Sequence, residues 1–191
     1  MQHTEITKLQ NVVNVIADLV TRAGPDVLLN ASPCAGWNGR DVLNHMVGAA
    51  DLFAGPARGE TMSFPDWSSM EDLLGNDPVT AYRNGVERVV AAYGAPGVLD
   101  GNVTMPWGEM PASFALNVLI ADHVTHAWDL GRAAGVPVQI DDAVVDVALQ
   151  TFRVSVVPEL RAAGFYGPEQ TEPPAATPLD RLAAFTGRSF Q

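Results

Sequence analysis

The chain has a single cysteine, Cys34, among 191 residues, so no disulfide can form within it. Basic residues are also few, because 11 lysines and arginines stand against 22 acidic residues and give a formal net charge of −11. That charge repels nucleic acid and anionic membrane surfaces, and no basic stripe offsets it. Neither a signal peptide nor an apolar run of about 18 residues is present. We therefore expect a cytoplasmic protein that binds neither nucleic acid nor membrane.

The composition is that of a folded globular protein. Hydrophobic residues make up 47% of the chain and charged residues 17%, which is far from the composition of disordered segments. A chain of this length most often forms one domain with a substantial core, and the sequence shows no internal repeat. We therefore expect residues 1–191 to form a single domain.

Apolar residues recur at helical spacing along most of the chain. They predict a first helix over residues 4–23. Asn38, with Asp41 three residues later, predicts the N-cap of a second helix, which we expect to end at Gly55-Pro56. Further helices are predicted from Asp77-Pro78, from about Ala112 to Ala134, from Asp141-Asp142 and, for a last short helix, from Thr177-Pro178.

The segments between these helices carry no alternating strand pattern of any length. Residues 56–76 are rich in Gly, Pro and Ser and are expected to form a mobile loop that Phe64 and Trp67 fix to the core. Residues 97–111 are expected to be extended or irregular. Four long helices without a sheet predict an all-α bundle.

Histidine is scarce, with four in the chain, of which His3 lies near the N-terminus. His123 and His126 lie together on one predicted helix, and His45 lies on another. Neutral imidazole and carboxylate are ligands of first-row divalent metals, and side chains three or four residues apart on a helix point to the same side. A ligand from a facing helix would complete three corners of a tetrahedron and leave the fourth open, as in a reactive metal site.

Helix geometry leaves the third ligand open. At 100° per residue, Asp122 lies about 40° and His123 about 60° from His126, so either neighbour can share a metal with it. Asp122 and His123 are about 100° apart, which disfavours both in one mononuclear site. Buried, hydrogen-bonded histidines without a metal are the alternative interpretation.

Three further side chains are candidates for a role beside such a site. Cys34 is either a nucleophile or, as we favour, a structural cysteine, because no histidine base accompanies it in the sequence. Glu109, in a turn with Trp107 that lies at the mouth of the site in this hypothesis, is a candidate proton acceptor. Asp129 either orients a ligand imidazole or forms an ion pair with Arg132.

Four sequence blocks occur together and in order along nearly the whole chain. They are Pro33–His45, Pro106–Pro111, Asp122–Gly135 with its His-Ala-Trp-Asp-Leu run, and the tail Pro178–Arg188. As a set they resemble the actinobacterial metal-binding proteins related to the N-terminal domain of mycothiol-dependent maleylpyruvate isomerase, within the DinB-like superfamily. No single block is specific enough by itself.

The resemblance implies a DinB-like four-helix bundle with an extra short C-terminal helix and one divalent metal ion, zinc or nickel. It implies His45, Asp122 and His126 as the metal ligands, because Asp122 falls on the family's carboxylate-or-histidine position four residues before the last histidine. His123 then remains the alternative ligand or a partner of a ligand. Mycothiol is the implied co-substrate, and a homodimer is a further expectation because DinB-like proteins often pair.

The functional hypothesis is a metal-dependent enzyme, a thiol-dependent transferase or isomerase that acts on a small electrophilic molecule. Its catalytic residues stay unassigned. The alternatives are a non-catalytic protein that binds a divalent metal or small ligand, and a metal-dependent hydrolase on the same scaffold. The isomerase has an additional C-terminal domain that contributes to its substrate site. Because we expect this chain to end before such a domain, the resemblance does not carry over the isomerase activity itself.

Overall fold

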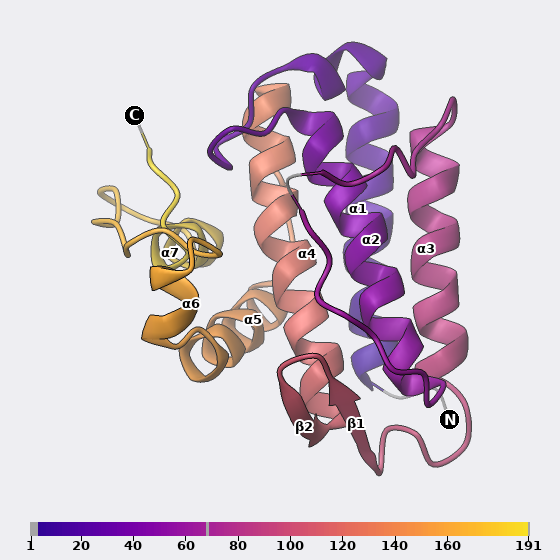
Figure 1. Ribbon diagram of the computed structural model, residues 1–191. Coiled ribbons are helices and arrows are strands. Elements are labelled where there is room, and N and C mark those ends of the chain that lie inside the picture. Colours follow the sequence, from indigo (N-terminus) through magenta and orange to yellow (C-terminus); the bar gives the residue numbers. More distant parts are fainter. Residues whose placement is uncertain (1–3, 68, 191) are drawn as a thin grey trace.

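A bundle of four long helices forms the main body of the protein, with a smaller helical layer beside it (Figure 1). The structure, a computed structural model, describes residues 4–67 and 69–190, so His3 lies outside the described part. The bundle consists of α1 (Thr4–Ala23), α2 (Gly39–Ala57), α3 (Pro78–Tyr93) and α4 (Ala112–Ala134). Both α1 and α2 pack against α3 and α4. The predicted all-α class is confirmed, and no described helix is long and apolar enough to cross a membrane.

The smaller layer is built by the C-terminal part of the chain. Helix α5 (Asp142–Ser155) packs against α4, and α7 (Pro178–Phe185) packs against both α5 and α4. The remaining elements are η1 (Pro25–Leu29), β1 (Asn102–Met105), β2 (Gly108–Pro111) and α6 (Pro158–Ala162). The antiparallel hairpin of β1 and β2 replaces part of the stretch that we expected to be irregular, because strands of four residues are too short to show an alternating pattern.

Helix starts follow the capping signals in the sequence. The Asn38 side chain accepts a hydrogen bond from the backbone N–H of Asp41, and the Asp41 carboxylate accepts one from the N–H of Asn38, which confirms the predicted capping box. The proline-led starts of α3 and α7 are also confirmed. The predicted end of α2 at Gly55-Pro56 is wrong, because the helix includes Pro56 and continues to Ala57. Pro56 has no N–H to donate, so the last turn lacks one backbone hydrogen bond. The N–H of Arg58 donates instead to carbonyls of that turn.

The loop between α2 and α3 lies along α2 in Figure 1. We call this loop, residues 58–76 without residue 68, the strap. Phe64 packs against Trp107 of the hairpin, and Trp67 packs against His45 of α2. The expected contact of these two aromatic residues with the body of the protein is therefore present, and the strap reaches His45 on α2.

Candidate metal centre

The three residues expected to bind a metal lie together between α2 and α4. His45 comes from α2, and Asp122 and His126 come from consecutive turns of α4. One ligand atom from each lies within 4.8 Å of the others. Asp122 Oδ1 is 3.2 Å from His45 Nε2 and 3.5 Å from His126 Nε2, so both imidazoles present the same ring nitrogen to one carboxylate.

This cluster lies at the edge of the core rather than deep inside it. The side chains of Asp122 and His45 are 21% and 12% exposed, whereas that of His126 is 6% exposed. Asp122 Oδ2 and His45 Nδ1 are buried and have no hydrogen-bond partner among the described residues. The cluster therefore combines a partly open side with buried polar atoms that lack partners, as expected for residues that hold a ligand.

Asp129 sets the orientation of His126. The Asp129 carboxylate is fully buried and lies 2.8 Å from His126 Nδ1, so this nitrogen donates its proton and Nε2 keeps a lone pair directed at Asp122. The orienting role considered for Asp129 is thus supported. The ion pair considered with Arg132 is not formed, because the Arg132 guanidinium lies over the Trp128 ring.

Arg188, near the C-terminus, is the ion-pair partner of Asp129. Its Nε and Nη2 donate to the two Asp129 carboxylate oxygens at 3.2 and 2.8 Å, and both side chains are buried. Burial opposes ionisation, but the pair outweighs it, so the pKa of Asp129 is lowered and that of Arg188 is raised. The residue before Arg188 is Gly187, which has a φ of +93°. A Cβ at Gly187 would lie 2.5 Å from the Gly167 Cα, so this position excludes a side chain.

The electrostatics of the cluster suit a cation. Burial lowers the pKa of His126, although the nearby Asp122 carboxylate partly offsets this effect, so His126 is a neutral imidazole at pH 7. Burial raises the pKa of Asp122, but the charge interactions and hydrogen bonds that the carboxylate makes with the imidazoles around it outweigh burial and hold the pKa well below its usual range. A neutral imidazole and an ionised carboxylate are the forms that coordinate a divalent metal.

His123 lies on the inner side of α4 and outside this group. Its side chain is fully buried, and its ring lies against that of Tyr82 from α3, with 5.7 Å between the centroids. Its Nδ1 is 3.4 Å from Asp122 Oδ2, a contact whose geometry does not make a hydrogen bond. The geometry therefore groups Asp122, rather than His123, with His45 and His126.

Two other candidates from the sequence do not join the cluster. Burial raises the pKa of the Cys34 thiol to about 11, so it is protonated at neutral pH, which supports a structural role. Glu109 is exposed and accepts a hydrogen bond from Asn102 across the hairpin. The hairpin joins the start of α4, about 15 Å along the helix axis from Asp122. Trp107 contacts Phe53 and Phe64 and does not line the cavity beside His45.

A comparison with known families assigns the chain. The sequence model of the mycothiol maleylpyruvate isomerase N-terminal domain matches residues 9–131, more than half of the chain, and this range contains the whole cluster. The chain belongs to this family. Arg188 and α5 to α7 lie beyond the matched range of the family.

Similar proteins extend the comparison over nearly the whole chain. This chain is 28% identical to each of two proteins of Mycobacterium tuberculosis over 191 residues, which cover 95% of this chain and 96% of theirs. They are uncharacterized protein MT0763 (strain CDC 1551 / Oshkosh) and uncharacterized protein Rv0738 (strain ATCC 25618 / H37Rv). Two crystal structures of mycothiol-dependent maleylpyruvate isomerase, one of a mutant, match with a TM-score of 0.62 at 15% and 16% identity. They cover 91% of this chain and 77% of the isomerase, and they establish the shared fold.

Proposed function

We propose that His45, Asp122 and His126 hold one divalent metal ion and that the protein is a thiol-dependent enzyme acting on a small electrophilic molecule. The observation that carries the proposal is the convergence of two Nε2 atoms and one carboxylate at the partly open edge of the core. Membership of a family named for a mycothiol-dependent isomerase supports mycothiol as the thiol. The reaction is then a transfer or an isomerisation.

The residues present fit such an ion. Two imidazoles and one carboxylate form a donor set that zinc and nickel accept, and three protein ligands leave a position for a small molecule. Asp122 Oδ1 lies 3.5 Å from His126 Nε2, whose lone pair faces it because Nδ1 carries the proton, so these two acceptor atoms meet with no proton between them and a cation would satisfy both. When bound, a divalent ion at this position would lower the pKa of a thiol and supply a thiolate nucleophile at neutral pH.

The chain itself positions this chemistry. Arg188 and Asp129 hold the His126 ring in place, and the Trp37 ring lies nearly parallel to it, at 25° and 6.1 Å between centroids, so this face is covered from water. In a transfer, the thiol sulfur bonds to the electrophilic carbon, the leaving group departs with the bonding electrons, and the thiol proton passes to solvent. No side chain of the described part is assigned as the proton acceptor.

The proposal is tested with cobalt-substituted protein, whose absorption spectrum reports on coordination. We expect mycothiol to change the spectrum of the wild type, and we expect a small electrophile to be converted only when mycothiol is present, with mycothiol consumed in a transfer and regenerated in an isomerisation. His126→Ala should abolish both effects, while Arg181→Ala, which alters an exposed arginine of α7, should leave both unchanged. An unchanged spectrum with thiol and no thiol-dependent conversion of the electrophile would leave the non-catalytic metal-binding alternative. Water-dependent turnover without thiol would instead support the hydrolase.

A further inference from the structure

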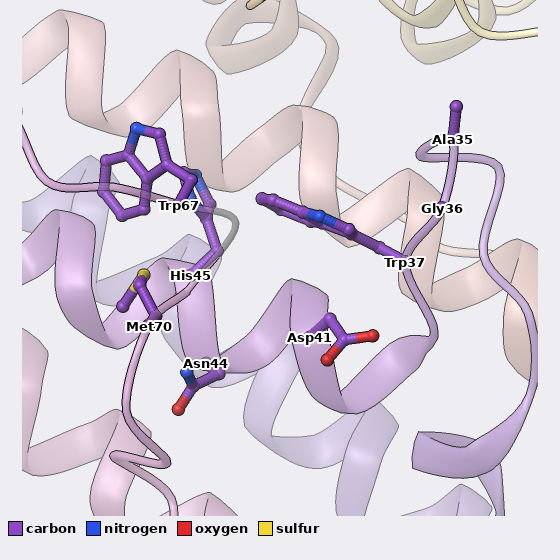
Figure 2. Close-up of a pocket in the computed structure, with 8 residues that line it drawn as sticks. All are labelled: Ala35, Gly36, Trp37, Asp41, Asn44, His45, Trp67 and Met70. Atoms are coloured by element: carbon purple, nitrogen blue, oxygen red, sulfur yellow. The ribbon is translucent and has the colours of Figure 1, made fainter.

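The proposed metal ligands have an open side and a closed side. On the open side, a cavity of about 330 Å³ adjoins His45, and Figure 2 shows the indoles of Trp37 and Trp67 beside it. His123 does not line this cavity. It lies on the closed side, where its side chain is fully buried and its ring packs against that of Tyr82 from α3. The polar atoms of the closed side therefore need partners within the core.

Buried polar atoms without partners gather on this closed side. The described residues contain seven such side-chain atoms, and four of them belong to Tyr82, Asp122 and His123. These four are the Tyr82 hydroxyl, Asp122 Oδ2 and both ring nitrogens of His123. Because an unpaired buried donor or acceptor is costly, four of them on adjoining side chains indicate one network rather than four separate losses.

The chemistry of Asp122 decides the direction of these hydrogen bonds. A carboxylate that binds a metal is ionised and can only accept hydrogen bonds. His123 Nδ1 is 3.4 Å from Asp122 Oδ2, slightly beyond the usual N–H···O distance of about 2.9 Å. A lone pair on Nδ1 would repel the carboxylate at this distance, so Nδ1 carries the ring proton. Because the last torsion of an aspartate is broad, a small rotation of the carboxylate aligns Oδ2 with that N–H.

Tyr82 is the partner for the other ring nitrogen. With the proton on Nδ1, His123 Nε2 is an acceptor. The Tyr82 and His123 rings lie 5.7 Å apart between centroids. Burial raises the pKa of Tyr82 well above its usual range, and the Asp122 carboxylate raises it further, so the hydroxyl keeps its proton and can donate. The three side chains then run from donor to acceptor in the order Tyr82, His123, Asp122.

We propose that His123 is a positioning residue that holds Asp122 Oδ2 through its Nδ1–H, and that Tyr82 fixes the tautomer of His123. This inference rests on the proposed function, because it assigns a fixed orientation to one proposed metal ligand. With Oδ2 held from the closed side, Oδ1 is the oxygen that faces the two imidazole Nε2 atoms of the cluster, at 3.2 and 3.5 Å. A ligand whose orientation is fixed in this way binds its metal more tightly.

The first test assigns the ring proton of His123 by nitrogen NMR of the full-length protein at pH 8. Long-range couplings between ring nitrogens and carbon-bound protons show which nitrogen carries hydrogen. The His123→Asn variant identifies the His123 signals among those of the four histidines. We expect the Nδ1–H tautomer in both metal-free and zinc-loaded protein. An Nε2–H tautomer would overturn the inference, because Nδ1 would then have no proton to donate to Asp122.

The second test compares two substitutions of His123 by cobalt titration. His123→Leu removes the N–H and should weaken cobalt binding about 10–100-fold. His123→Asn keeps an amide N–H near the position of Nδ1 and should retain most of the affinity. Packing alone predicts the reverse order, because leucine fills the buried position better than the smaller asparagine.

The third test removes the Tyr82 hydroxyl. Tyr82→Phe should weaken cobalt binding about three- to tenfold, less than His123→Leu, because Tyr82 acts on Asp122 through His123. Tyr93→Phe is the matched control, since Tyr93 is also a buried tyrosine of α3 whose hydroxyl has no partner among the described residues. Tyr93 lies about 16 Å further along that helix, so its substitution should leave the affinity unchanged.

Cobalt binding by the wild type separates this inference from the proposed function. A wild type that binds no cobalt would contradict the proposed function itself. If the wild type binds cobalt but His123→Leu binds it equally well, or better than His123→Asn does, the role of His123 alone is overturned. Equal affinities in Tyr82→Phe and Tyr93→Phe would overturn the role of Tyr82.

Discussion

Replacing Arg188 with alanine should destabilise the fold and weaken the metal centre together. Arg188 is 8% exposed and Asp129 is fully buried, so the substitution leaves a buried carboxylate whose remaining partner is His126. Removing one member of a buried ion pair typically costs about 3–5 kcal/mol of unfolding free energy. Because Asp129 orients a proposed metal ligand, loss of its anchor should also reduce metal affinity about 10–100-fold.

The assay combines urea unfolding of the metal-free protein with a cobalt titration. The matched control is Arg181→Ala, because Arg181 lies in the same C-terminal segment but is exposed and 4.0 Å from its partner Glu172. We expect that control to cost less than about 1 kcal/mol. In the double variant Arg188→Met with Asp129→Asn, part of the lost stability should return, because no uncompensated charge remains. An Arg188→Ala protein as stable as the control, with unchanged cobalt affinity, would refute the reasoning.

Three further predictions concern single groups. Alkylation of Cys34 by iodoacetamide should stay slow at pH 8, because a pKa of about 11 leaves about 0.1% thiolate, and rapid alkylation of the folded protein would contradict this. Burial lowers the pKa of His126 below its usual 6.5, so below about pH 6.5 the unfolded chain binds a proton that the folded chain does not. The metal-free protein should therefore lose stability through this group as the pH falls below about 6.5, and urea unfolding at pH 7 and 5.5 checks the sign. Asn38→Ala should lower the unfolding free energy by about 1 kcal/mol through loss of the capping box, and an unchanged urea midpoint would count against that cap.

Local signals predicted the helices and where most of them begin. The capping box at Asn38 and the capping residues before α3 and α7 act within one turn, so the sequence shows them directly. The end of α2 was predicted at Gly55-Pro56, whereas the helix continues to Ala57, because a proline in the last turn costs little and the N–H of Arg58 hydrogen-bonds to carbonyls of that turn. The short hairpin escaped prediction for a related reason, since strands of four residues leave no periodic pattern.

Most of the candidate site could be predicted from the sequence, but whether Asp122 or His123 joins His126 depends on tertiary packing. Helical spacing places His126 near both Asp122 and His123, and the resemblance favours Asp122. In the structure, α2 brings His45 to the Asp122 side, while Tyr82 of α3 covers His123. Which helix faces which residue is a property of the whole bundle, so spacing on α4 could not decide it.

Contacts between distant segments were the part that the sequence could not show. Arg188 is 59 residues from Asp129 along the chain, and no local pattern links them. A buried Asp129 on α4 does require a partner, which is the one signal that could have prompted a search for a distant arginine. The strap can bring Trp67 to His45 because Gly48 of α2 has no side chain, since a Cβ there would lie 3.3 Å from the Trp67 ring. This close fit between α2 and the strap forms only on folding.

Metal content under matched substitutions tests the central claim most directly. Protein purified from zinc-supplemented cells and dialysed is analysed for zinc as the wild type, Asp122→Asn and His123→Asn. The proposed site predicts about one equivalent in the wild type and in His123→Asn, and a loss of most of the metal in Asp122→Asn, because Asp122 supplies the one carboxylate of the cluster. Equal zinc in the wild type and Asp122→Asn, or a loss confined to His123→Asn, would contradict it.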